Sequence, residues 1–391
     1  MKKTLALLTA VMLFLAPALS LADDLRFYTD VIKQGHSLYL GTYDDEPIEW
    51  LVLSPNKSST GQSGGTFLIA RDLLTTTTFD TRYYLSSNLR NMCTSMYISS
   101  FNPAEKAIIM STSTGDEASS VVTDNKLRVR PVPLSADKLF LLSYAETEAY
   151  LPAEYRAADP SWYMRNNMEL RADSDTVGYL VCNKWGEYSY TTMTNSFSGG
   201  FRPGMNIMLD GGAYITPAAG GKSDALGLTP IREQAGVTAW RLTLENGAEL
   251  FTATVDETVY SDDRKVTIET TAQSYDDVCC ILMNTDGEAM YYGKVAEATG
   301  KASFTLPEEL PNGTYYLMLF AEHRIGDYHT DYMSRQALAS VTLTDRPAVT
   351  PTPTPVPSVP ATGDGSPLML LALLGGCSAA ALLILRKRAM R

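Results

Sequence analysis

The sequence is poor in the side chains on which most catalytic centres are built. Its 391 residues include only three histidines and five cysteines. Residues 61–65 match Gly-x-Ser-x-Gly, but they are expected to form a Gly/Ser turn before a strand, whereas the nucleophile elbow of serine hydrolases leads from a strand into a helix. The sequence has no His-Glu-x-x-His motif and no glycine loop that could cradle a phosphate. These features argue against the common serine hydrolases, zinc proteases and nucleotide-binding enzymes. We therefore assign no catalytic residue, no cofactor and no metal ligand.

Basic residues are scarce beside acidic ones. The chain has 32 Lys and Arg against 44 Asp and Glu, a net charge of −12. Because such a surface repels phosphate backbones, we expect no nucleic-acid partner. Cys279 and Cys280 are neighbours, which point to opposite faces if they lie in a strand. Cys93 and Cys182 can pair only if the fold brings them together, and we expect buried free thiols.

Long apolar runs occur only towards the two ends. Residues 1–22 combine a cationic start, an apolar run and small residues up to Ala22, which is typical of a secretory signal peptide. Residues 367–385 carry no charge and are long enough for one transmembrane helix. The basic tail 386–391 favours a cytoplasmic C-terminus. These segments predict a protein exported through a membrane and held there once.

A short motif precedes the second apolar run, and it consists of Val359, Pro360, Ala361, Thr362 and Gly363. Motif, apolar run and basic tail together resemble the LPXTG-type sortase sorting signal of Gram-positive bacteria. The resemblance implies cleavage between Thr362 and Gly363 and covalent attachment to peptidoglycan, with a single membrane helix before processing. Val359 stands where Leu is commonest, which leaves the sortase class open. The alternative is a single-pass plasma-membrane protein that is never cut.

The segment between these ends is long enough for two domains. Residues 23–210 alternate strand and helix patterns and predict an α+β domain, followed by a Gly/Ala/Pro-rich linker at 211–236. Short alternating strands separated by Asn-Gly and Asp-Gly turns predict an immunoglobulin-like β-sandwich at 237–345, which we interpret as a stalk. Proline-rich residues 346–358 predict a stiff polyproline II spacer.

Three helix starts are marked in the first domain. Ser87 is expected to cap a helix whose apolar residues recur with helical spacing. Asn102 followed by Pro103 marks a second start, because proline is favoured in the first turn. Ser143 with Glu146 three residues later is the pattern of a capping box.

Six landmarks of the first domain occur in a characteristic order, at residues 47–53, 88–90, 101–106, 137–143, 161–165 and 199–205. This succession resembles the bacterial domain-of-unknown-function family 6273, which has no assigned activity. A Trp-x-x-Arg strand followed by Gly-x-Arg-Pro is also similar to C-type-lectin-like and formylglycine-enzyme-like scaffolds. That resemblance implies an α+β core beside a variable binding face.

Five residues are candidates for ligand binding. Arg165 and Arg202 lie on apolar strand segments, so they are either buried guanidiniums that hold loops together or an anion or glycan site. Trp185, Tyr188 and Tyr190 are either core aromatics or a face that stacks on sugar rings. Their neighbours are polar and include a glycine, as in an exposed loop.

These features predict a cell-wall-anchored surface protein that displays a non-catalytic, adhesin-like domain. Its expected partners are sortase, peptidoglycan and an unidentified extracellular glycan or protein. Two alternatives stay open, a wall-attached enzyme acting on glycans or peptides, and a structural subunit of the wall or of a pilus.

Overall fold

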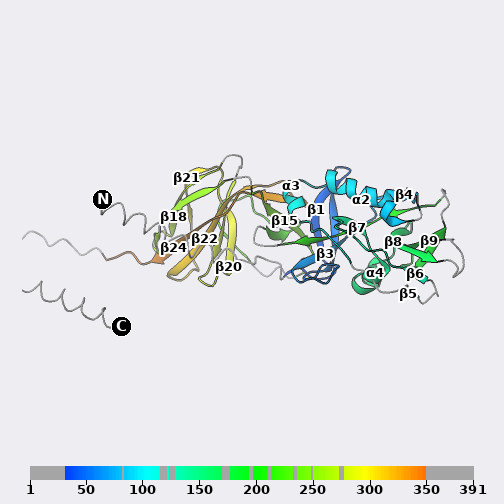
Figure 1. The fold of residues 1–391 in the computed structure, drawn as a ribbon. Coiled ribbons are helices and arrows are strands. Elements are labelled where there is room, and N and C mark those ends of the chain that lie inside the picture. Colours follow the sequence, from blue (N-terminus) through cyan, green and yellow to red (C-terminus); the bar gives the residue numbers. More distant parts are fainter. Residues whose placement is uncertain are drawn as a thin grey trace, which may run out of the picture. The chain divides into compact units, whose positions relative to one another are not determined.

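The computed structural model describes residues 31–348, apart from residue 82 and the segments 115–120, 123–127, 170–176, 193–196, 210–212, 232–235, 248–249 and 273–276. Strands predominate in this part of the chain, as Figure 1 shows. The expected signal peptide at 1–22 lies outside the described residues. So do the sorting motif, the expected membrane helix and most of the spacer, all within 349–391.

The prediction of an α+β, lectin-like first domain is wrong. Its described helices are short, and strands outnumber them. They are α2 (Asn88–Ser99), α3 (Pro103–Ile108), α4 (Tyr144–Tyr150) and the 3-10 turns η2 (Tyr84–Ser86) and η3 (Ala153–Tyr155). None of the helices in the described ranges is long and apolar enough to cross a membrane. The architecture of the described residues is therefore mainly β, and the expected membrane helix lies outside them.

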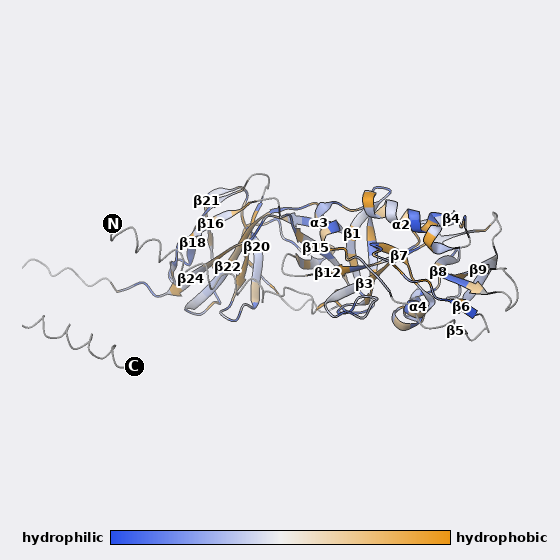
Figure 2. Cartoon of the chain, in the orientation of Figure 1, coloured by the Kyte–Doolittle hydropathy of each residue, from blue (hydrophilic) through white to orange (hydrophobic). Residues whose placement is uncertain are grey.

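The three helix starts form as expected from their caps. The Ser87 hydroxyl accepts a hydrogen bond from the Arg90 amide at 3.2 Å at the start of α2. Asn102 and Glu105 form a capping box around α3, and Ser143 and Glu146 form one around α4. In Figure 2 the colouring of α2 changes between hydrophilic and hydrophobic along its length, as expected of a helix with one buried face.

One large sheet contains strands from both halves of the described chain. Its first half has the order β7-β12-β3-β2-β1, and β1 pairs in parallel with β15. These strands are β1 (Ser37–Tyr43), β2 (Glu46–Ser54), β3 (Gly65–Ala70), β7 (Leu139–Leu141), β12 (Pro203–Met208) and β15 (Ala239–Glu245). Trp50 in β2 is fully buried, and its indole donates to the Leu40 carbonyl at 2.8 Å.

Beyond β15 the same sheet continues through strands of the second half. The order is β23-β22-β19-β20-β14, with β24 beside β22, β17 beside β24 and β13 beside β15. These strands are β13 (Ala213–Pro217), β14 (Thr229–Pro230), β17 (Thr258–Tyr260), β19 (Asp277–Met283), β20 (Ala289–Ala296), β22 (Gly313–His323), β23 (Asp331–Met333) and β24 (Ala337–Thr344).

A separate three-stranded sheet completes the second core. It has the order β16-β18-β21, formed by β16 (Thr252–Val255), β18 (Lys265–Thr271) and β21 (Gly300–Thr305). Val266 and Ile268 from this sheet belong to one hydrophobic cluster with Leu317 and Leu319 of β22. The second half is thus two packed layers of strands.

Two expected boundaries differ in the structure. The segment expected as a linker, 211–236, contributes β13 and β14 to the large sheet. The strand expected to open the sandwich, β15, instead packs Leu242 and Leu244 into the core of the first half. The described residues up to Arg346 form one compact unit.

The remaining sheet carries the aromatic candidates. Its order is β10-β9-β8-β11-β4, with β6 beside β8 and β5 beside β6. Its strands are β4 (Thr75–Thr78), β5 (Val121–Val122), β6 (Arg128–Arg130), β8 (Trp162–Glu169), β9 (Val177–Cys182), β10 (Tyr188–Thr192) and β11 (Ser198–Phe201).

Candidate functional site

The hairpin between β9 and β10 has a well-defined turn. The Asn183 side-chain oxygen accepts hydrogen bonds from the amides of Trp185 at 2.9 Å and Glu187 at 3.0 Å. Gly186 has a φ of +78°, which favours glycine, and its amide donates to the Asn183 carbonyl. Asparagine and glycine therefore fix the backbone on both sides of Trp185.

Trp185 projects from this turn into solvent. Its side chain is 70% exposed, and the ammonium of Lys184 lies 4.8 Å from the ring centroid. Tyr190, on β10, is 47% exposed. Trp185 and Tyr190 are thus accessible to a ligand, and they form the candidate binding surface. We call Lys184, Trp185, Tyr188 and Tyr190 the aromatic hairpin.

Tyr188 connects the hairpin to helix α4. Its hydroxyl donates to Glu148 at 2.6 Å, and its ring meets Tyr144 edge-on at 4.8 Å. Arg156 also pairs with Glu148, at 2.5 Å, and lies over the Tyr188 ring. Burial and the bond to Glu148 raise the pKa of Tyr188 well above its ordinary value. The phenol therefore stays neutral, and the base of the hairpin is anchored on both sides.

The two arginine candidates do not join this surface. Arg165 is fully buried and pairs with Glu146 through both terminal nitrogens. Arg202 donates three bonds of 2.8 Å to the carbonyls of Ala70, Arg71 and Tyr155. Burial lowers the pKa of Arg202 to about 10, which leaves it charged at neutral pH. Both guanidiniums hold strands and loops together and are inaccessible to a ligand.

Two further places in the second half carry acidic side chains. A cavity of about 440 Å³ lies along β16, β18 and β21 and is lined by charged, hydroxyl-bearing and aliphatic side chains, among them Asp256 and Glu269. Its lining contains no aromatic ring, histidine or cysteine, so we do not place the site there. The acidic pair Asp262 and Asp263 is bound by Arg346 at 2.7 and 3.1 Å. No cluster of three or more metal-ligating side chains occurs within the described ranges.

The described cysteines are free and buried, as the sequence predicts for Cys93 and Cys182. Burial raises the pKa of Cys93 to about 12 and that of Cys182 to about 11. Because the thiolate is the reactive form, neither residue is a catalytic nucleophile at neutral pH.

The raised pKa of Cys93 predicts a loss of stability in alkali. A group with a higher pKa in the folded chain gives its full contribution below the unfolded pKa, here 9.0, and loses it as pH rises towards about 12. We expect Cys93→Ala to show a shallower fall in unfolding free energy over this window than the wild type. Urea denaturation at several pH values measures both slopes, and identical slopes would contradict the assignment.

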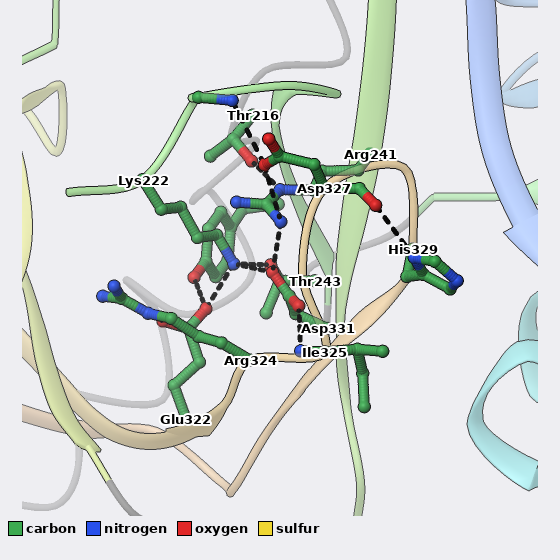
Figure 3. A network of polar contacts seen from close by, with 12 residues as sticks. Thr216, Lys222, Arg241, Thr243, Glu322, Arg324, Ile325, Asp327, His329 and Asp331 are labelled. Atoms are coloured by element: carbon green, nitrogen blue, oxygen red, sulfur yellow. Dashed lines mark hydrogen bonds and ion pairs between the residues drawn. The ribbon is translucent and has the colours of Figure 1, made fainter. Parts of the chain in front are cut away.

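Sequence reasoning missed a buried polar cluster, which Figure 3 shows. Lys222 lies between β13 and β14, and its side chain is 1% exposed. Its ammonium lies 2.5 Å from Glu322, 2.6 Å from Asp331 and 2.6 Å from the Thr243 hydroxyl. Both carboxylates are 0% exposed. The signal in the sequence was one lysine in a glycine- and alanine-rich segment.

Glu322 is the most heavily bonded member of this cluster. Tyr214 donates to Oε1, and Tyr292 at 2.7 Å and Arg324 at 3.0 Å donate to Oε2. Burial alone would raise the pKa of Glu322, but the charges of Lys222 and Arg324 outweigh it and hold that pKa well below its usual range. Glu322 is therefore a carboxylate inside the protein.

Comparison with known proteins supports the family assigned to the first domain. Residues 63–207 match the model of a family described as Domain of unknown function (DUF6273). This region includes the aromatic hairpin and both buried arginines. No curated protein matches the chain.

Proposed function

We propose that this protein is displayed on a bacterial cell wall and binds an extracellular ligand through the aromatic hairpin, without catalysing a reaction. The observation that carries the proposal is the side chain of Trp185, 70% exposed at the tip of a turn fixed by Asn183 and Gly186. A rigid aromatic ring loses little conformational entropy when it meets a flat apolar surface.

The neighbouring groups favour a carbohydrate over a purely apolar ligand. Lys184 offers hydrogen-bond donors above the Trp185 ring, and Glu187 offers acceptors in the same turn. Sugar rings present apolar C–H faces for stacking and hydroxyls at their edges, which matches an aromatic platform with a polar rim. The alternative is a protein ligand, which can also present an apolar surface with polar groups at its edge.

An array of glycans and cell-wall polymers tests this binding proposal. The purified exported chain is expected to bind at least one carbohydrate saturably. Absence of binding to every carbohydrate would reject a glycan ligand and leave protein partners to be tested.

Display on the wall is proposed from the sequence. The motif at 359–363, the apolar run and the basic tail have the order of a sortase signal. Sortase, peptidoglycan and, before cleavage, the membrane are the proposed partners of this end. Localisation is then extracellular and covalently wall-bound, or in the plasma membrane with a cytoplasmic C-terminus if no cleavage occurs.

Replacing Thr362 with alanine is expected to remove the protein from the covalently bound wall fraction. Transfer joins the carbonyl of this residue to the wall, so an altered side chain at the cleaved bond should block recognition. Detergent-extracted walls from a sortase-bearing Gram-positive host, digested with a muralytic enzyme and immunoblotted, measure the change. Thr354→Ala, in the proline-rich spacer, is the matched control. Equal wall-bound amounts of the Thr362 variant and the wild type would contradict sortase anchoring.

A further inference from the structure

The buried cluster places an amine against two carboxylates with no room for bulk water. Glu322 and Asp331 follow Lys222 by 100 and 109 residues in the chain. Figure 3 shows the Lys222 side chain directed between the two acids. Burying three charges carries a large desolvation free energy, and neutralising two of them would remove part of this penalty.

We propose that Lys222 and Asp331 become joined by an isopeptide bond that the folded chain forms by itself, with Glu322 as the catalytic base. The lysine Nζ lies 2.6 Å from Asp331 Oδ2. The acyl carbon is one bond beyond that oxygen, so the nucleophile and the carbon it would attack are already held together. Such positioning is worth effective molarities of about 10⁵ M or more in intramolecular reactions.

The surroundings distinguish the two acids. Asp331 Oδ1 accepts a hydrogen bond from the Ile325 amide at 2.7 Å, and Arg241 lies 3.6 Å from Oδ2. The Ile325 amide can therefore stabilise the oxyanion that develops on Oδ1, while the Arg241 cation lies beside Oδ2, the oxygen that leaves. Glu322 is instead bonded by Tyr214, Tyr292 and Arg324 and lies 2.5 Å from the amine. These contacts make Glu322 the proton acceptor and Asp331 the acyl donor.

The reaction balances without any added reagent. Glu322 takes one proton from the Lys222 ammonium, and the free amine adds to the Asp331 carboxyl carbon. Two protons originally on nitrogen pass to Oδ2, one of them by way of Glu322, and the C–Oδ2 bond breaks. Water leaves, an amide N–H remains, and Glu322 returns to its carboxylate form. The two charges of the ion pair are replaced by a neutral amide, which suits a site that excludes solvent.

Peptide mapping of the full-length protein tests the bond. Trypsin cannot cleave after an amidated lysine, so residues 185–232 should remain one peptide. This peptide should be joined to residues 325–335, and the pair should be one water lighter than the sum of its parts. Recovery of free 185–222 and 325–335 as the main products would overturn the proposal. A link to 302–324, the peptide that holds Glu322, would overturn the assignment to Asp331.

Two controls are available in the chain. Lys294 and Asp277 form another lysine–aspartate pair at 3.3 Å, with side chains 11% and 18% exposed. We expect cleavage after Lys294 and no cross-link there. Glu322→Gln keeps the shape but removes the base, so the cross-link should be lost while a cooperative thermal transition persists. An undiminished cross-link in that variant would show that Glu322 is not the base, and the wild-type map alone decides whether the bond exists.

Discussion

Replacing Glu146 with alanine is expected to lower the free energy of unfolding by about 3 to 5 kcal/mol, the usual cost of leaving one partner of a buried ion pair alone. Arg165, its partner, is 0% exposed and would keep its charge inside the protein. The variant also loses the capping box of α4, because the Glu146 carboxylate accepts from the Ser143 amide at 2.9 Å. Urea denaturation followed by circular dichroism measures the change.

Glu148→Ala is the matched control on the same helix. Glu148 also pairs with an arginine, Arg156 at 2.5 Å, but its side chain is 43% exposed. Exposed ion pairs contribute about 0 to 1 kcal/mol, so this variant should unfold close to the wild type. Losses of similar size in the two variants would contradict the structural role assigned to Arg165.

Replacing Trp185 with alanine is expected to weaken binding by about 30-fold or more for the carbohydrate that the protein binds on the array. Tryptophans at the centre of a binding surface contribute about 2 kcal/mol or more when truncated, which corresponds to this ratio. Titration of that carbohydrate, followed by surface plasmon resonance, measures the change in affinity. The unfolding free energy should barely change, because the ring is 70% exposed.

Tyr83→Ala provides the control for a general loss of exposed aromatic surface. Tyr83 is 59% exposed and lies outside the hairpin, at the start of η2. Its removal should leave the affinity unchanged. Equal losses from both substitutions would show that binding does not depend on the hairpin.

Local features of the fold could be predicted from the sequence, and strand pairing could not. The caps at Ser87, Asn102 and Ser143 depend on residues a few positions apart, and all three form. Strand β15 alternates as any half-buried strand does, and nothing in its own pattern shows that it pairs with β1. For the same reason the first domain was expected to be α+β, although its strands far outnumber its short helices.

The candidate site residues show the same difference between local and distant determinants. Trp185 could be placed on a loop because glycine and polar residues surround it in the sequence, and the structure exposes it. The role of Arg165, structural or ligand-binding, could not be decided from the sequence, because its partner Glu146 lies 19 residues away. The composition around Lys222 predicts only a linker, since its acidic partners are distant in the chain and only the fold brings them together.

Quenching of tryptophan fluorescence tests the central claim, a ligand-binding aromatic hairpin, most directly. Of the four tryptophans, Trp50, Trp162 and Trp240 are buried and Trp185 alone is exposed. Iodide should therefore quench mainly Trp185 in the free chain. A saturating concentration of the carbohydrate that the protein binds on the array should protect this emission from iodide. The Trp185→Ala variant should lack the quenchable component. Unchanged quenching at saturation would contradict a binding face at the hairpin.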